Sequence, residues 1–223
     1  MENTKFKPKA FLFDLNGTMI NDMKFHADAW HTIITEKLGL KISYDDVKKE
    51  MYGKNEELLV RVFGKDYFTP EQVETISIEK EKRYQEAYLP SLKLIDGLHQ
   101  FLVKAKDNGI KMAIGSAAIP FNIDFVIDKL GIRSYFDAIV SANDVRLSKP
   151  DPETFINAAI SLGVKPEDSV VFEDVPKGVE SAKRGNMNCF VLTTTHNIEE
   201  FKNFDNILGY IADYNDPILT HLF

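Results

Sequence analysis

The pattern of hydrophobic and polar positions changes twice along the chain. An apolar run, Phe11 to Phe13, ends in an acid and a glycine turn, which is typical of a buried strand. From about residue 20 to residue 91 apolar residues recur at helical spacing, and from Leu92 onward short apolar runs alternate with helical segments. This pattern predicts an α/β core whose first strand is followed by a helical insert.

The insert is expected to be all-helical. Its first helix is placed over residues 21–38 and is closed by Gly39, since glycine is the common residue after the last helical turn. Further helices are predicted near residues 44–51, 56–62 and 70–88, with breaks at glycines between them. The apolar stripe of the first helix consists of Met23, Ala27, Trp30 and Ile34.

The remainder of the chain predicts a parallel sheet. Expected strands cover residues 112–115, 138–141, 169–173 and 188–192. Right-handed crossovers between parallel strands place helices on both faces of a sheet. We therefore predict an α/β fold in which residues 1–20 and 92–223 form a Rossmann-like parallel sheet core and residues 21–91 form an inserted all-helical cap domain.

Size and charge limit the function classes. At 223 residues, with 44% hydrophobic and 27% charged content, the chain can bury a sizeable core. Its net charge of −7 argues against a nucleic-acid or anionic-membrane surface, because phosphate backbones need a basic footprint. The single cysteine excludes an intramolecular disulfide, and no apolar run is long enough to span a bilayer. We predict a cytoplasmic monomer that acts on a small molecule.

Polar clusters follow three predicted strands, whose carboxyl ends face one crevice in an open parallel sheet. The first cluster holds Asp14, Asn16 and Thr18; an Asp there is often only a turn residue, but the apolar run and the glycine favour function. The second is Ser116, ahead of a helix opened by Pro120. A hydroxyl and free amides at a helix start form an anion site, although a Ser without a ligand shows the same pattern.

The third cluster is the acid pair Glu173 and Asp174, directly after a strand. Adjacent carboxylates repel unless a cation is near, and their hard oxygens suit Mg²⁺ together with a substrate phosphate. A solvated acidic turn is the alternative. Lys149, held extended by Pro150, adds a cation ahead of a helix that Asp151 is expected to cap, although many single lysines are exposed surface residues.

The order and spacing of these pieces resemble the haloacid dehalogenase-like phosphatase superfamily, in particular its β-phosphoglucomutase-like branch with a helical cap inserted after the first strand. The resemblance implies that Asp14 attacks phosphorus and forms a phospho-aspartate. It also implies that Ser116, Ala117 and Lys149 hold the phosphoryl group. Mg²⁺ and Lys149 would offset the repulsion between the carboxylate and the phosphate. The implied Mg²⁺ ligands are Asp14, the Asn16 carbonyl, Glu173 and Asp174.

Asn16 departs from the family pattern, which usually has an acid that protonates the leaving oxygen and activates water. An amide cannot titrate, and losing general acid–base help typically costs about 10²- to 10⁴-fold. We hypothesise that His26 contributes to proton transfer. His26 and Trp30 are neighbours on the first insert helix and match cap positions that face the β-phosphoglucomutase active site; the alternative is a surface histidine beside a packed tryptophan.

The residues expected to bind a second phosphate group also differ from those of the mutases. Glu56 falls near the position of a phosphate-binding Arg, and Ala118 and Ile119 replace a Ser and a Lys. Lys54 could supply one charge, although a surface lysine at a helix start fits equally well. A mutase must retain its bisphosphate intermediate, so the weaker grip favours hydrolysis of a monophosphate.

Three functions therefore compete. The leading prediction is a Mg²⁺-dependent phosphohydrolase of a small, sugar-phosphate-like metabolite, acting through phospho-Asp14. A hexose-phosphate mutase is the second, and transfer from a sugar bisphosphate without net phosphate release would favour it. The third is a catalytically impaired protein that binds a phosphate ligand, which predicts ligand-induced stabilisation without turnover.

Overall fold

The computed structural model describes residues 7–223, and they fall into two compact units. One unit comprises the described residues of Met1–Asn21 together with Lys93–Phe223, and the other comprises Asp22–Leu92. We call them the α/β unit and the helical unit. Residues 1–6, which the predicted core domain includes, lie outside the described part, and the domain assignment itself stays a prediction.

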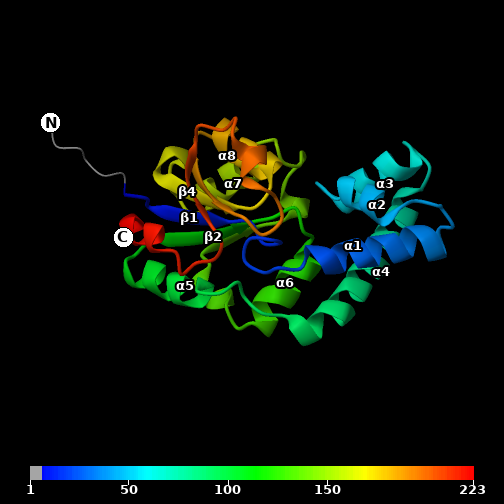
Figure 1. Cartoon of the computed structure of the whole chain (residues 1–223), viewed down its shortest axis with the longest axis horizontal. Coiled ribbons are helices and arrows are strands. Elements are labelled where there is room, and N and C mark those ends of the chain that lie inside the picture. Colours follow the sequence, from blue (N-terminus) through cyan, green and yellow to red (C-terminus); the bar gives the residue numbers. More distant parts are fainter. Residues whose placement is uncertain (1–6) are drawn as a thin grey trace. The chain divides into compact units, whose positions relative to one another are not determined.

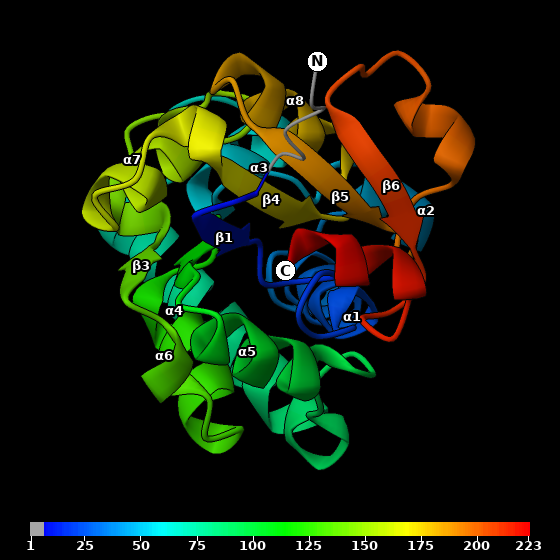
Figure 2. The same ribbon diagram turned by 90° about the vertical axis from the view of Figure 1, so that its left-hand side faces the viewer.

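The α/β unit is built on a parallel sheet with the strand order β3-β2-β1-β4-β5-β6. Figure 1 labels the central strands β2, β1 and β4, and Figure 2 labels β3, β5 and β6. From β1 the chain builds the sheet outward through β2 and β3, and then returns to the other side of β1 to add β4. The sheet consequently has a topological switch point between β1 and β4, where α/β sheets bind ligands. The strands are β1 (Ala10–Phe13), β2 (Lys111–Gly115), β3 (Ala138–Val140), β4 (Ser169–Glu173), β5 (Asn188–Leu192) and β6 (Ile207–Ile211).

Helices cover both faces of this sheet, which confirms the predicted fold class. Figures 1 and 2 show α5 and α6 on one face and α7 and α8 on the other. Right-handed crossovers between parallel strands produce this three-layer arrangement. The four helices are α5 (Leu98–Asp107), α6 (Pro120–Lys129), α7 (Glu153–Ser161) and α8 (Pro176–Arg184).

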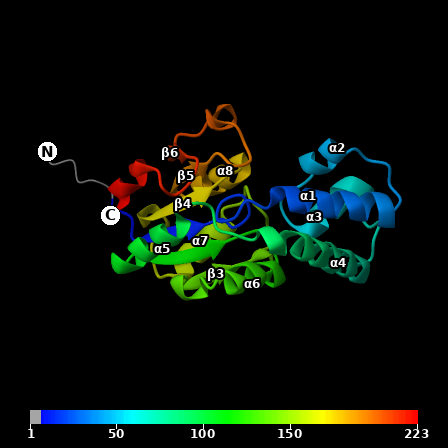
Figure 3. The ribbon, with the colours of Figure 1, turned by 60° about the horizontal axis from the view of Figure 1, so that its bottom comes forward.

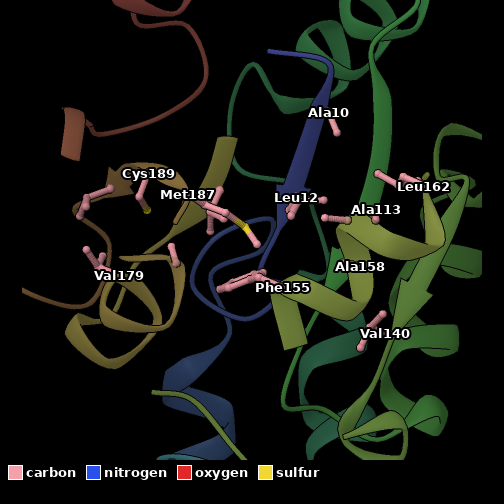
Figure 4. Packing of buried hydrophobic residues seen from close by; sticks show 14 of the residues in the cluster. Ala10, Leu12, Ala113, Val140, Phe155, Ala158, Leu162, Val179, Met187 and Cys189 are labelled. Carbon is pink, nitrogen blue, oxygen red and sulfur yellow. The ribbon is translucent and has the colours of Figure 1, made fainter. Parts of the chain in front are cut away.

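The central strand β1 is apolar at every position because both of its faces are buried. Leu12 belongs to a buried cluster that includes Phe155 of α7 and Val179 of α8 (Figure 4). Phe11, which points to the opposite face, stacks on Phe101 of α5 with ring centroids 5.1 Å apart. Packing on both faces holds β1 in place, and the position of Asp14, the residue that follows β1, is fixed with it.

The helical unit contains α1 (Met23–Thr32), α2 (Tyr44–Lys49), α3 (Asn55–Phe63) and α4 (Pro70–Tyr88). Figures 1 and 3 show α1 and α4 lying side by side. One end of the unit is an apolar cluster that includes Trp30, Ile33 and Leu58. Within residues 7–223, no helix combines the length and the apolar character needed to cross a membrane.

Three local predictions need correction. The helix predicted over residues 21–38 is α-helical only to Thr32 and continues as a π-helical turn over Ile33–Lys37. There the Thr35 hydroxyl donates to the His31 carbonyl, which competes with the regular helical ladder. The helix after Lys149 begins at Glu153, yet the Asp151 carboxylate accepts from the Glu153 amide as a cap would. Strand β6 was not predicted.

Candidate active site

The register of the sheet brings the predicted strand-end residues to one edge. Phe13 of β1 is level with Ile114 of β2 and with Phe172 of β4. Asp14 and Glu173 are the next residues along their strands, and the Asp14 amide donates to the Phe172 carbonyl at 3.0 Å. The two acids therefore meet at the switch point between β1 and β4.

Lys149 is not an exposed surface lysine; it is 8% exposed and forms the centre of an ion-pair cluster. Its Nζ lies 2.6 Å from Asp14 Oδ1, 2.8 Å from Glu173 Oε1 and 3.1 Å from the Gly115 carbonyl oxygen. Burial alone would lower the pKa of Lys149, but the adjacent Asp14 and Glu173 carboxylates outweigh it and raise the pKa. The ammonium therefore stays charged at neutral pH.

Protein donors hold both carboxylate oxygens of Glu173. Oε1 accepts from Lys149, and Oε2 accepts from the amides of Asp174 and Val175 at 2.8 and 3.0 Å. Gly178, in the first turns of α8, permits this arrangement, because a Cβ atom there would lie 1.8 Å from Glu173 Oε1. Glu173 thus fixes Lys149 and the turn into α8.

Asp174 has a different environment, although it is the next residue. Its Oδ1 accepts from the Thr18 hydroxyl at 3.2 Å, and its Oδ2 accepts from the Thr195 hydroxyl. Gly17 lies against it with φ +78°, and a Cβ atom there would be 2.1 Å from Oδ2. Among the described residues, the side-chain donors to this buried carboxylate are both neutral hydroxyls.

The three acids form a group that fits a hard divalent cation. Asp14, Glu173 and Asp174 can each offer one oxygen within 4.8 Å of the others. Burial first, and then the charges of Glu173 and Asp14, raise the pKa of Asp174. Lys149 pairs with two of the three carboxylates, so the cluster holds more negative than positive charge. Carboxylate oxygens in such an excess are the ligands that Mg²⁺ prefers.

Ser116 follows β2 at the same edge and is buried. Its Oγ accepts from the Ala118 amide at 3.1 Å, and its own amide donates to the Val140 carbonyl at 2.9 Å. Within residues 7–223 the structure gives its hydroxyl hydrogen no acceptor. That hydrogen, with the turn around Ala117 that leads into α6, forms a donor set suited to a phosphate.

Asn16 lies half-buried in the loop after β1. The loop is tied down on both sides: the Gly17 amide donates to the Ile20 carbonyl at 2.8 Å, and the Thr194 hydroxyl donates to the Gly17 carbonyl. The Asn16 side chain brings no titrating group to the loop. Any proton transfer at this position must come from another residue.

His26 lies in the helical unit, in a second buried cluster of charged and aromatic side chains. Lys80 Nζ lies 2.7 Å from His26 Nδ1, Asp22 Oδ2 lies 3.3 Å from His26 Nε2, and the imidazole stacks on Tyr84 with centroids 3.7 Å apart. When Lys80 donates this bond, His26 Nδ1 accepts it and Nε2 is the nitrogen that faces Asp22. The surface alternative for His26 is wrong, since it is 7% exposed; its catalytic role stays a prediction.

The other two predicted cap residues also belong to the helical unit. Trp30 is buried in its apolar cluster, and Lys80 Nζ lies 5.3 Å from the ring centroid. Lys54 is half-buried at the start of α3, where its amide donates to the Glu57 carboxylate at 2.9 Å. Glu56, which was predicted to fall near the position of the mutase Arg, is exposed on α3. Their roles in substrate binding remain predictions.

Sequence reasoning missed the contribution of the loop after β5. Thr194 and Thr195 reach Gly17 and Asp174 from this loop, on the far side of β4. The signal was present, because three threonines directly follow a predicted strand whose carboxyl end faces the same crevice. The role of Gly178 was missed as well, since a helical pattern does not show that a carboxylate packs against a particular glycine.

Comparison with known proteins gives the following findings. A model described as haloacid dehalogenase-like hydrolase matches residues 8–186. The chain is 28% identical to validoxylamine A 7'-phosphate phosphatase of Streptomyces hygroscopicus subsp. limoneus, over 94% of this chain and 97% of that protein. It is 30% identical to β-phosphoglucomutase of Bacillus subtilis, over 80% of each. A solved HAD hydrolase, family IA, variant 3, from Entamoeba histolytica matches with TM-score 0.84 at 26% identity, over 96% of this chain and 97% of that one.

Proposed function

Because this chain belongs to the haloacid dehalogenase-like hydrolase family, we propose that it is a Mg²⁺-dependent phosphohydrolase of small phosphorylated metabolites that acts through phospho-Asp14. One observation carries this proposal: Lys149 bridges Asp14 and Glu173, and the third acid, Asp174, lies in the same cluster without a cation of its own among the described residues. An anchored nucleophile beside an excess of carboxylates suits phosphoryl transfer assisted by a cation.

In the first step an Asp14 carboxylate oxygen bonds to phosphorus while the bond to the substrate's ester oxygen breaks. Lys149 orients Asp14 through Oδ1 and reduces the repulsion between the carboxylate and the incoming phosphate. Ser116 donates to a phosphoryl oxygen. Of the four predicted ligands, Asp14, Asp174 and the Asn16 carbonyl would hold Mg²⁺, which when bound supplies positive charge to the phosphoryl oxygens. Glu173, whose two oxygens already accept from Lys149 and two backbone amides, would instead keep Lys149 in place. In the second step water attacks the phosphorus of phospho-Asp14, which releases phosphate and restores the carboxylate.

Both steps move a proton, and the Asn16 side chain cannot carry it. The departing ester oxygen must gain one, and the attacking water must lose one. We propose His26 as the carrier, because imidazole is the side chain most often used in general acid–base transfer, and Lys80 at Nδ1 and Asp22 at Nε2 hold the ring in place. If wild type and His26→Ala show coinciding pH–rate profiles, His26 has no part in the reaction.

Relatives named validoxylamine A 7'-phosphate phosphatase and β-phosphoglucomutase support a small phosphorylated substrate of the sugar-phosphate kind. Hydrolysis is favoured over mutase activity because Glu56, Ala118 and Ile119 stand where a mutase needs donors for a second phosphate. Net phosphate release from a monophosphate distinguishes the two. A protein that only binds phosphates would instead be stabilised by ligand without turnover.

The proposal is tested by comparing wild type with Asn16→Asp on sugar phosphates and on an activated aryl phosphate, with Mg²⁺ present. A gain of about 10²- to 10⁴-fold by Asn16→Asp on the sugar phosphates, whose leaving oxygens need a proton, with a much smaller gain on the aryl ester, would show that proton transfer is the missing step and would exclude His26 as the carrier. Similar rates of wild type and Asn16→Asp are expected if His26 carries the proton. Intact-mass analysis of each sample controls for deamidation at Asn16-Gly17. Absence of turnover by both proteins on both substrate classes would refute the proposal.

A further inference from the structure

The loop between β5 and β6 reaches the acid cluster through consecutive threonines. The hydroxyl of Thr194 donates to the Gly17 carbonyl, and that of Thr195 contacts both the carboxylate and the carbonyl oxygen of Asp174. Thr193, one residue earlier, instead lies 3.4 Å from the Ile211 carbonyl, away from the acids. Thr194 and Thr195 therefore form hydrogen bonds with the two segments that contain the proposed metal ligands, whereas Thr193 does not.

The direction of the hydrogen bonds at Thr195 follows from its chemistry. A hydroxyl has one hydrogen, and the acceptors around it are the oxygens of Asp174, one at 3.1 Å. The Thr195 oxygen is also 2.9 Å from His196 Nδ1. Because the hydroxyl hydrogen is directed to Asp174, the imidazole must donate from Nδ1. His196, Thr195 and Asp174 thus form a chain of hydrogen bonds that ends on the acid.

We propose that Thr195, oriented by His196, is a positioning residue that holds the Asp174 carboxylate in the orientation needed to bind Mg²⁺. The inference rests on the proposed Mg²⁺-dependent function. A hydroxyl orients a carboxylate without neutralising it, whereas an ammonium would compete with the metal ion. Glu173 shows the contrast, since it is already bound by Lys149 and two backbone amides.

Thr18 alone cannot replace this contact. Within residues 7–223 its hydroxyl contacts Oδ1 of Asp174, at 3.2 Å, and a single donor restrains rotation about the Cβ–Cγ bond less than donors at both oxygens do. Removing the Thr195 hydroxyl is therefore expected to weaken Mg²⁺ binding even though no ligand atom is lost. Partners that orient metal ligands typically contribute about 10- to 100-fold in metal affinity.

The test is calorimetric titration of the full-length protein with Mg²⁺ in the absence of substrate. Thr195→Val, which keeps the shape and removes the hydroxyl, should bind Mg²⁺ about 10- to 100-fold more weakly than wild type. Thr195→Ser should restore the affinity, and Thr193→Val, the matched control on the same loop, should bind like wild type. At saturating Mg²⁺ the KM of Thr195→Val for an aryl phosphate should match that of wild type.

Equal Mg²⁺ affinity of Thr195→Val and Thr193→Val would overturn the inference while leaving the proposed function intact. Absence of Mg²⁺ binding by wild type would refute the proposed function itself. If Thr195→Val does not fold, as judged by circular dichroism, His196→Phe decides: it keeps a ring but loses the Nδ1 donor. Weaker Mg²⁺ binding by His196→Phe supports the proposed chain, and wild-type affinity overturns it.

Discussion

The two units of this protein each bury a lysine among acids, and the two lysines behave in opposite ways. Lys149 of the α/β unit is 8% exposed and Lys80 of the helical unit is 2% exposed. Lys149 contacts two carboxylates, and its pKa is raised. For Lys80 burial dominates, and the charges of Glu81 and Asp22 only partly offset it, so its pKa is lowered.

The difference lies in the balance between burial, which lowers the pKa of a lysine, and contacts with carboxylates, which raise it. Within residues 7–223, Lys80 forms an ion pair with one carboxylate, that of Glu81 at 3.0 Å, while Asp22 accepts from the Tyr84 hydroxyl at 2.5 Å. At the strand ends even a charged Lys149 leaves negative charge in excess. We therefore expect a cation to bind at the α/β cluster and not at the helical one.

The largest expected effect comes from Lys149→Met. The variant should lose about 10²- to 10³-fold in turnover, because it lacks the charge that orients Asp14 and stabilises the phosphoryl group. Its affinity for Mg²⁺ without substrate should rise, since one positive charge is removed from beside the carboxylates. Steady-state kinetics and calorimetry measure the two quantities.

The matched control for Lys149→Met is Lys9→Met, which removes a lysine whose ion pair with Asp168 lies at the surface. It should change neither quantity. A fall in Mg²⁺ affinity of Lys149→Met together with its turnover would contradict the charge argument made for this cluster.

A middle-sized effect is expected from Gly178→Ala. Alanine usually stabilises a helix relative to glycine by roughly 0.5–1 kcal/mol. Here its Cβ would meet the Glu173 carboxylate, so we expect the free energy of unfolding to fall by about 1–3 kcal/mol, as overpacking of a core does. Urea unfolding measures it.

Gly185→Ala at the other end of α8 serves as the control for Gly178→Ala. A Cβ there meets mainly the flexible end of Met187, at 3.1 Å, and φ is −80°, so little change is expected. Gly178→Ala and Gly185→Ala with the same stability would show that the Glu173 carboxylate moves aside easily, and that its position in the site is not fixed.

The smallest effect is a pH dependence that belongs to Lys80. Between its lowered pKa in the folded protein and the ordinary value of 10.5, the unfolded chain holds one more proton than the folded one. The free energy of unfolding of wild type should therefore rise with pH in this window relative to Lys80→Met, and the difference should level off above 10.5.

Unfolding can be followed by the fluorescence of Trp30, the single tryptophan, which is buried in the folded protein. Trp30 reports on the surroundings of Lys80, whose Nζ lies 5.3 Å from the ring. The slope is the decisive quantity, since other titrating groups are common to both proteins and cancel in the comparison. A difference that shrinks as pH rises would mean that the pKa of Lys80 is raised, as that of Lys149 is, and would remove the contrast between the two lysines.

The sequence predicted those features of the fold that depend on neighbouring residues, and it missed features that depend on contacts formed only in the folded protein. Apolar runs and helical spacing are local, so β4, β5 and α4 were predicted with the bounds that the structure has. Strand β6 was missed because it is a half-exposed edge strand with Gly209 at its centre. The π-helical turn was missed because it continues the apolar spacing of α1, and the Thr35 hydrogen bond that accompanies it leaves no mark on the hydrophobic pattern.

The site followed the same rule. Acids and a serine after parallel strands predicted one cluster, because strand ends meet in any such sheet. What each acid contacts could not be predicted: Glu173 and Asp174 are adjacent, yet one is bound by a lysine and two amides and the other by two hydroxyls. The side-chain donors come from loops that are distant in the sequence, and the position of each loop is set by the packing of the complete α/β unit.

The central claim, that Asp14 carries the phosphoryl group, is tested most directly by intact-mass analysis of the protein, acid-quenched during reaction with an activated aryl phosphate and Mg²⁺. An activated aryl group leaves without needing a proton, whereas hydrolysis of the phospho-enzyme still requires that water lose one, so the phospho-enzyme should form faster than it is hydrolysed. We predict one added phosphoryl group per wild-type molecule and none on Asp14→Asn. Equal labelling of Asp14→Asn, or continued turnover by wild type with no labelled protein at any time, would contradict the account.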